Sequence, residues 1–179
     1  GLEILKKGGN AIDASVAVQF ALAVVYPIAG NIGGGGFMVY RDKNGEVTTL
    51  DFREMAPSGA HRDMYLDENE EVIPRLSLDG HLAAGVPGSV AGMLDAHEKH
   101  GSLPWAELVQ PAINLAKNGF KVTEKQAVNL NKFAERFAKF NPTNNYLQKE
   151  EEWKEGDLLV QSDLSETLIR IRDEKRDCL

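Results

Sequence analysis

The chain lacks a basic surplus, a set of cysteines and a long apolar run, and each absence excludes a class of protein. Its single cysteine, Cys178, rules out an intrachain disulfide framework, although it does not identify the compartment. The most apolar stretch, Ala14 to Tyr26, is interrupted by Ser15 and Gln19, so it is too short to span a bilayer and has no signal-peptide flanks. A net charge of -7 argues against nucleic acid as a partner.

The remaining composition is that of an ordinary globular domain. Of 179 residues, 42% are hydrophobic and 26% are charged, which suffices for a substantial buried core. No internal repeat or low-complexity tract divides the chain, so we expect one domain over residues 1–179. Because the sequence opens as GLEILKKGG, inside a helical pattern, we expect this domain to be a fragment of a longer protein.

Helices are predicted where apolar residues recur at helical spacing between capping and stop residues. Asn10 with Asp13, and Thr123 with Gln126, have the three-residue spacing of a capping box. The helix that follows Asn10 is apolar on nearly every face, so we expect it to be buried. Helices are expected over residues 2–7, 11–25, 90–100 after a Ser89 cap, 104–117 with a kink at Pro111, 124 to about 140, and 163–174.

The dipeptide Asn44-Gly45 predicts a β-hairpin between strands at 37–42 and 46–53. Taking it as a two-residue loop determines the register by counting and places Arg53 opposite Gly36. Both faces are substantially apolar and two strands alone are marginal, so we expect a central sheet whose other strands lie outside these 179 residues. A further short strand is a candidate at 158–160. The predicted register puts Phe37, Val39, Leu50 and Phe52 on one face, and Met38, Tyr40, Val47 and Asp51 on the other.

Two features at the open end of this hairpin are candidates for chemistry. The run Gly33 to Gly36 has no side chains, so we expect it where backbone approaches closely, either packed backbone or backbone amides that face a reacting centre. It matches neither nucleotide-binding fingerprint, and it precedes a strand instead of opening a helix. The guanidinium of Arg53 is suited either to holding a carboxylate through two parallel hydrogen bonds, or to a structural ion pair with Asp51 or Glu54.

Other polar residues form no catalytic or metal-ligating pattern. His97, Glu98 and His100 have the spacing H-E-x-H, which places two imidazoles less well around one tetrahedral ion than H-E-x-x-H does, so we expect no metal site. Thr48-Thr49 lies in mid-strand with no base nearby, so we expect no nucleophile there. Residues His61, His81 and Glu150 to Glu152 are expected in solvated loops.

Four segments together closely resemble the gamma-glutamyltranspeptidase (glutathione hydrolase) family: GLEILKKGGNAIDASVAV, GNIGGGGFMVYR, LDFREMAP and GVPGSVAGM. Their spacing, and the later segments PAINLAKNGF and GDLLVQSDL, fit the same family. The resemblance covers essentially the whole chain and corresponds to the front part of the family's large subunit. Family members continue for a long way beyond RIRDEKRDCL.

The resemblance implies an α+β fold, as part of the αββα sandwich of an N-terminal nucleophile hydrolase that is incomplete in this chain. The precursor of such an enzyme cuts itself to free an amino-terminal threonine on a small subunit, and this threonine attacks a γ-glutamyl amide to form an acyl-enzyme. Glutathione or another γ-glutamyl compound is the donor, and water, an amino acid or a peptide is the acceptor. No cofactor is implied, and bacterial relatives are usually periplasmic or secreted.

Within this chain the resemblance assigns a substrate-binding role to Arg53, the arginine of the family's F-R-E motif, here Phe52-Arg53-Glu54. In the family this arginine holds the α-carboxylate of the donor. The nucleophilic threonine and the oxyanion-hole glycines belong to the small subunit, so we expect no catalytic residue in this chain and no activity from the chain alone. The alternatives are a related acylase or poly-γ-glutamate hydrolase, a non-catalytic binding protein with the same fold, and, more distantly, a nucleotide-binding module.

Overall fold

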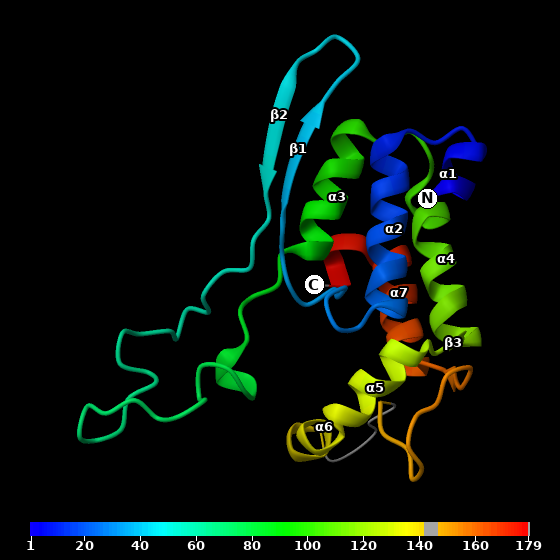
Figure 1. Ribbon diagram of the computed structural model, residues 1–179. Coiled ribbons are helices and arrows are strands. Elements are labelled where there is room, and N and C mark those ends of the chain that lie inside the picture. Colours follow the sequence, from blue (N-terminus) through cyan, green and yellow to red (C-terminus); the bar gives the residue numbers. More distant parts are fainter. Residues whose placement is uncertain (142–146, 179) are drawn as a thin grey trace.

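The computed structural model describes residues 1–141 and 147–178 and shows a mixed helix-and-strand fold (Figure 1). A hairpin projects beside the helices, and a long irregular segment extends away from them. We call this segment, residues 56–85, the arm. The α+β class is confirmed. The helical body consists of α1 (Leu2–Lys6), α2 (Ala11–Val25), α3 (Ser89–His100), α4 (Trp105–Asn118) and α7 (Ser162–Glu174), and the hairpin of β1 (Phe37–Arg41) and β2 (Val47–Asp51).

The centre of the helical body is the contact of α2, α4 and α7. Phe20 of α2, Leu108 of α4 and Leu168 of α7 are fully excluded from solvent. The rings of Phe20 and Trp105 meet edge to face with centroids 5.4 Å apart, which is a preferred aromatic geometry. The buried helix predicted over 11–25 is therefore confirmed with the same bounds, although a minority of its residues are exposed.

The carboxylate of Asp13, in the first turn of α2, is fully buried. It accepts hydrogen bonds from the Asn10 N–H (2.9 Å), the Ser102 N–H (3.0 Å) and hydroxyl (2.6 Å), and the Leu103 N–H (3.3 Å). The Asn10 side chain accepts in return from the Asp13 N–H, so the predicted capping box is confirmed. Burial alone would raise the pKa of Asp13, but the hydrogen bonds from the Ser102 hydroxyl and the three N–H groups hold the pKa below its usual value. The carboxylate thus ties α2 to the connection between α3 and α4.

The hairpin is present, but its predicted register is wrong by one residue. Asp42 lies opposite Glu46, and the loop between them has three residues, Lys43-Asn44-Gly45. The Asp42 carboxylate accepts hydrogen bonds from the N–H groups of Asn44 (2.8 Å) and Glu46 (2.9 Å). Gly45 has φ +89°, the left-handed conformation that a three-residue hairpin loop requires at its last position. The Asp42 side chain therefore stabilises a loop one residue longer than the Asn-Gly pattern predicts.

This shift changes which residues share a face of the hairpin, because a one-residue slip moves a side chain to the opposite face. Met38, Tyr40 and Leu50 pack against the helical core. Phe37 and Val39 lie on the outer face, where their side chains are 67% and 75% exposed. Both predicted groupings are therefore wrong: Phe37 and Val39 do not share a face with Leu50 and Phe52, nor Met38 and Tyr40 with Val47 and Asp51.

The lower part of the molecule contains α5 (Glu124–Lys132), α6 (Ala134–Phe140) and a small sheet of β3 (Phe120–Lys121) and β4 (Leu158–Leu159). The single helix predicted to residue 140 is wrong, since Phe133, with φ -102° and ψ 5°, separates α5 from α6. The strand candidate at 158–160 is confirmed and pairs antiparallel with β3. The capping box of Thr123 and Gln126 is confirmed, whereas the predicted Ser89 cap is wrong, because Gly88 is the N-cap of α3 and Ser89 is its first helical residue.

No helix within residues 1–141 and 147–178 combines the length and the apolar character needed to cross a membrane. The described chain ends in a short 3-10 helix, Lys175–Cys178, which follows α7. Its Arg176 pairs with Asp95 of α3, so the end of the described chain is fastened to the helical body.

The arm is irregular except for a short 3-10 helix, His81–Ala83, so the expectation that His81 lies in a loop is wrong. The arm is held at three places. Its base is closed by a bridge between Met55 and Val86, and a second bridge within it joins Leu66 and Val72. Farther along, Asp79 accepts two hydrogen bonds from Arg75, at 2.7 and 3.1 Å, and a third from Arg136 of α6. The hydrogen bonds from Arg75 hold the pKa of Asp79 below its usual value, with Arg136 adding to the effect. Asp79 is thus the ionic attachment of the arm to the lower part of the molecule.

We expect Asp79→Asn to increase the rate at which trypsin cleaves after Arg75. The amide keeps the shape of the carboxylate but loses the charge that two guanidinium groups share, so the arm opens more often. Mass-spectrometric timing of the cut after Arg75 measures this rate. Asp63→Asn is the matched control, since Asp63 also lies in the arm but has a loose, exposed ion pair with Arg62 at 3.6 Å. Equal cleavage rates in the two variants would contradict the attachment.

Candidate functional site

The segment Phe52-Arg53-Glu54 lies where β2 ends and the arm begins, and its backbone is held on both sides. Upstream, Phe52 exchanges two backbone hydrogen bonds with Gly36, of 3.3 and 3.0 Å. Downstream, Met55 and Val86 exchange two more, of 3.1 and 2.8 Å. The position of Arg53 opposite Gly36, which the predicted register required, is therefore wrong, because Phe52 occupies that place.

Within the glycine run, Gly35 is pressed against this segment, backbone to backbone. A Cβ on Gly35 would lie 2.3 Å from Glu54 N and 2.6 Å from Arg53 Cα, distances that real Cβ atoms essentially never show. Gly88, just before α3, approaches from another side, where a Cβ would lie 2.1 Å from Phe52 O. Gly34 O accepts hydrogen bonds from the N–H groups of Gly88 (2.8 Å) and Ser89 (2.9 Å), which joins the run to α3. Of the two interpretations of the run, close backbone packing is the one that the structure bears out.

The side chain of Phe52 is enclosed by two further glycine contacts. A Cβ on Gly92 of α3 would lie 2.1 Å from Phe52 Cγ, and a Cβ on Gly36 would lie 2.9 Å from Phe52 Cε2. Glycine at both positions therefore makes room for one aromatic ring between α3 and the run. The position of the F-R-E segment is consequently determined by the packing of the Phe52 ring and by the contacts of its backbone.

The guanidinium of Arg53, in contrast, is open to solvent. Its side chain is 68% exposed, and its Nε lies 3.7 Å from Glu54 Oε1, an ion pair of loose geometry. The Asp51 carboxylate accepts a hydrogen bond from the Arg53 backbone N–H at 3.0 Å, so it orients the backbone at Arg53. A guanidinium on a fixed backbone that is paired this loosely can still present its fork of N–H donors to a carboxylate.

The other polar candidates of the sequence lie elsewhere and serve packing. His97 Nε2 lies 2.8 Å from Leu103 O, and the ring of His100 contacts the ring of Tyr40 with centroids 4.6 Å apart. Thr48 and Thr49 lie in the middle of β2, as expected for strand residues. Within the described residues, no three His, Cys, Asp or Glu side chains gather as metal ligands.

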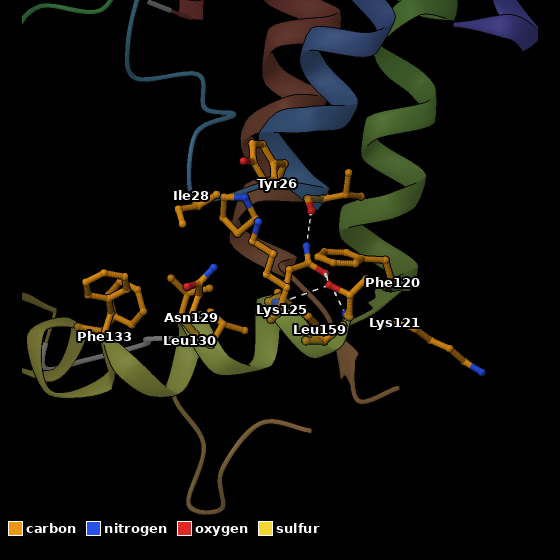
Figure 2. A pocket seen from close by; sticks show the side chains of 16 residues that line it. Tyr26, Ile28, Phe120, Lys121, Lys125, Asn129, Leu130, Phe133 and Leu159 are labelled. Carbon is orange, nitrogen blue, oxygen red and sulfur yellow. Dashed lines mark hydrogen bonds between the residues drawn. The ribbon is translucent and has the colours of Figure 1, made fainter. Parts of the chain in front are cut away.

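The sequence did not reveal a cavity of about 640 Å³ that lies between the end of α2, β3 and α5 (Figure 2). Tyr26 and Ile28 lie on one side of it, and Asn129 of α5 and Phe133, which follows α5, lie on the opposite side. Gln126 donates to Val25 O at 2.6 Å across its inner end. The lining is mainly apolar and contains neither a carboxylate nor an imidazole, and Arg53 is not part of it. Its titratable side chains are Tyr26, Lys121 and Lys125.

Comparisons with known proteins agree on one family. A family model described as Gamma-glutamyltranspeptidase matches residues 1–179. The glutathione hydrolase proenzyme of Pseudomonas aeruginosa is 51% identical over 176 residues, which is 98% of this chain and 31% of that protein. The glutathione hydrolase proenzyme of Escherichia coli is 46% identical over 179 residues, which is 99% of this chain and 31% of that protein. The chain thus spans 31% of the length of these curated relatives.

Solved structures give the same result. The gamma-glutamyltranspeptidase of Helicobacter pylori superposes with a TM-score of 0.92 at 51% identity, over 96% of this chain and 50% of that one. The transpeptidase CapD of Bacillus anthracis superposes with a TM-score of 0.75 at 35% identity, over 99% of this chain and 55% of that one. On the sequence match over its whole length and the agreement in fold, the chain belongs to the gamma-glutamyltranspeptidase family.

Proposed function

We propose that the protein to which this chain belongs transfers and hydrolyses γ-glutamyl groups of glutathione-like amides, and that Arg53 holds the donor. The observation that carries this proposal is the placement of the F-R-E segment. Its backbone is held by Gly36 and Val86, while the Arg53 guanidinium remains 68% exposed. A guanidinium on a fixed backbone suits bidentate recognition of a small α-carboxylate.

The chemistry would follow the pattern of an amino-terminal threonine nucleophile outside this chain. The threonine hydroxyl attacks the γ-carbonyl carbon of the donor, and its own α-amine takes the hydroxyl proton. The amide C–N bond breaks, the departing amine takes that proton, and an ester joins the glutamyl group to the threonine. Water or an acceptor amine then attacks the ester and regenerates the hydroxyl. In this cycle Arg53 binds and orients the donor and takes no part in proton transfer.

We also propose that residues 1–179 are one part of an αββα sandwich completed by further chain, including a small subunit of the same precursor. The outer face of the hairpin supports this, since Phe37, Val39 and Val47 are 67%, 75% and 60% exposed there. A sheet face with three such apolar side chains is suited to a covering layer. The expected compartment, periplasmic or secreted, is part of the same proposal.

The test is a peptide map, by mass spectrometry, of the protein expressed in its natural host, together with an assay for release of p-nitroaniline from L-γ-glutamyl-p-nitroanilide. We expect a copurifying peptide with a new amino-terminal threonine, and activity in the two-chain protein but none in the isolated 179-residue chain. A chain that occurs alone and inactive in the host would instead support a non-catalytic protein of the same fold. Activity of the isolated chain would overturn the assignment of the nucleophile to another segment.

A related acylase is the second candidate, and the comparisons support it less. The cephalosporin acylase of Bacillus halodurans superposes with a TM-score of 0.79, but at 25% identity, against 51% for the gamma-glutamyltranspeptidase of H. pylori. The p-nitroanilide assay separates the two, because it measures γ-glutamyl donors directly. A protein that processes itself and yet leaves this donor intact would favour the acylase.

A further inference from the structure

We propose that Gly92 and Phe52 are positioning residues for Arg53. Because Gly92 of α3 has no side chain, the Phe52 ring can pack against the helix, and the position of this ring determines where the Arg53 guanidinium lies. This inference rests on the proposed donor-binding role of Arg53 and extends it into the helical body. It assigns a part in donor recognition to a buried helix residue that does not reach the donor itself.

The first step is the contact between α3 and the ring. A Cβ built on Gly92 would lie 2.1 Å from Phe52 Cγ, 2.5 Å from Phe52 Cβ and 2.6 Å from Phe52 Cδ2. These atoms form the root of the side chain, so a rotation about χ2 does not relieve the overlap. A methyl group at Gly92 therefore requires Phe52 and α3 to move apart.

The second step is that α3 does not readily give way. Val90, Met93 and Leu94, on the same two turns, are 3%, 5% and 0% exposed within the main core. Moving this helix would open closely packed contacts with the rest of the body, which is costly in a close-packed interior. The displacement therefore falls on the segment after β2 that carries Phe52.

The third step is that a displaced Phe52 carries Arg53 with it. The tip of the ring meets Gly36, where a Cβ would lie 2.9 Å from Phe52 Cε2, and the backbone of Phe52 is paired with the same glycine. Arg53 follows directly and is itself pressed against Gly35, where a Cβ would lie 2.6 Å from Arg53 Cα. A shift at Phe52 is thus passed to the next residue with little slack, so the guanidinium no longer presents both arms of its fork to the donor carboxylate.

The experiment measures donor KM and kcat for Gly92→Ala in the whole two-chain protein with L-γ-glutamyl-p-nitroanilide. We expect donor KM to rise about tenfold or more while kcat changes less, because hydrogen bonds to the donor carboxylate that are made in ground state and transition state alike are weakened, while the nucleophile is untouched. Ala96→Gly is the control on the same helix, since it weakens α3 by removing a methyl group from the core and adds no atom beside Phe52. It should lower the melting temperature and leave KM unchanged. Gly59→Ala, at an exposed position with open space around it, should change neither quantity.

A double variant tests whether the effect of Gly92 on donor binding is exerted through Arg53. If Gly92 acts through Arg53, adding Gly92→Ala to Arg53→Lys should raise KM no further than Arg53→Lys alone, whereas a full additional rise would overturn the coupling. A raised KM for Arg53→Lys with an unchanged KM for Gly92→Ala would refute this inference and leave the proposed function intact. No change in either single variant would remove the role of Arg53, and this inference with it.

If Gly92→Ala does not fold, Phe52→Leu tests whether the packing of Phe52 positions Arg53. Leucine keeps Cβ and Cγ but removes the ring tip that meets Gly36, so the segment loosens without an overlap. A raised donor KM in a variant with a cooperative thermal transition supports the positioning role. A wild-type KM in that variant refutes it.

Discussion

Replacing Asp13 by alanine is expected to lower the free energy of unfolding by about 3 kcal/mol or more, measured by urea denaturation at pH 7. The fully buried carboxylate accepts hydrogen bonds from four donors, in Asn10, Ser102 and Leu103. Alanine leaves these partly buried donors without their acceptor, and a hydrogen bond to a charged group contributes about 1.5–3 kcal/mol. Asp163→Ala is the control, since Asp163 also lies in the first turn of a helix but is exposed. If Asp13→Ala lowers the unfolding free energy no more than the control does, water replaces the carboxylate as the acceptor for these donors.

The difference in unfolding free energy between wild type and Asp13→Ala should depend on pH. The pKa of Asp13 is lower in the folded chain than in the unfolded chain, so on acidification the unfolded chain takes up the proton first. The stability that the carboxylate contributes is therefore complete above its ordinary pKa, near pH 4, and is lost as pH falls through the folded-state pKa. The difference in unfolding free energy between wild type and Asp13→Ala should be constant from pH 7 to 5 and shrink below pH 4. A difference that grows on acidification would contradict the lowered pKa.

Arg53→Lys is expected to raise donor KM about tenfold to a hundredfold in the two-chain protein, with a smaller change in kcat. Lysine keeps the charge but offers no planar fork, so one or more charge-assisted hydrogen bonds to the donor carboxylate are lost, each contributing about 1.5–3 kcal/mol. A loss of binding shared by ground state and transition state appears in KM and not in kcat. Steady-state kinetics with L-γ-glutamyl-p-nitroanilide measure both quantities.

The control for that substitution is Arg62→Lys in the arm. Arg62 is also an exposed arginine beside its acidic sequence neighbour, at 3.6 Å from Asp63, so it matches Arg53 in everything but position at the glycine run. It should leave KM unchanged. A wild-type KM for Arg53→Lys as well would return Arg53 to the role of a surface ion pair with Glu54.

Local rules predicted the helix starts well, because a capping box depends on residues three apart. Asn10 with Asp13, and Thr123 with Gln126, both form as the spacing indicates. The same spacing did not show that Asp13 is also the acceptor for Ser102, a partner 89 residues away. A side chain that caps its own helix thus has a second function that only tertiary structure reveals.

The errors have a common physical origin in side chains that override a local pattern. The Asn-Gly pair favoured a two-residue turn, but the Asp42 carboxylate stabilised a longer one and reversed the faces of β1. In the lower part of the molecule, the apolar spacing continued through Phe133, while the backbone there left helical geometry. For the candidate site, the glycine run and Arg53 were both identified, but the contact of Gly92 with Phe52 joins residues far apart in sequence.

The hairpin and the arm, between the end of α2 and the start of α3, form one excursion from a body whose helices contact one another directly. Closing so long a loop costs little more than closing a shorter one, since the entropy grows only with the logarithm of length. The helices can therefore contact one another across the excursion, which is placed by Met38, Tyr40 and Leu50 on the core and by the Phe52 ring against α3. Over evolutionary time this arrangement separates two pressures, because substitutions in the exposed part of the excursion can change what is bound while the contacts among the helices stay as they were.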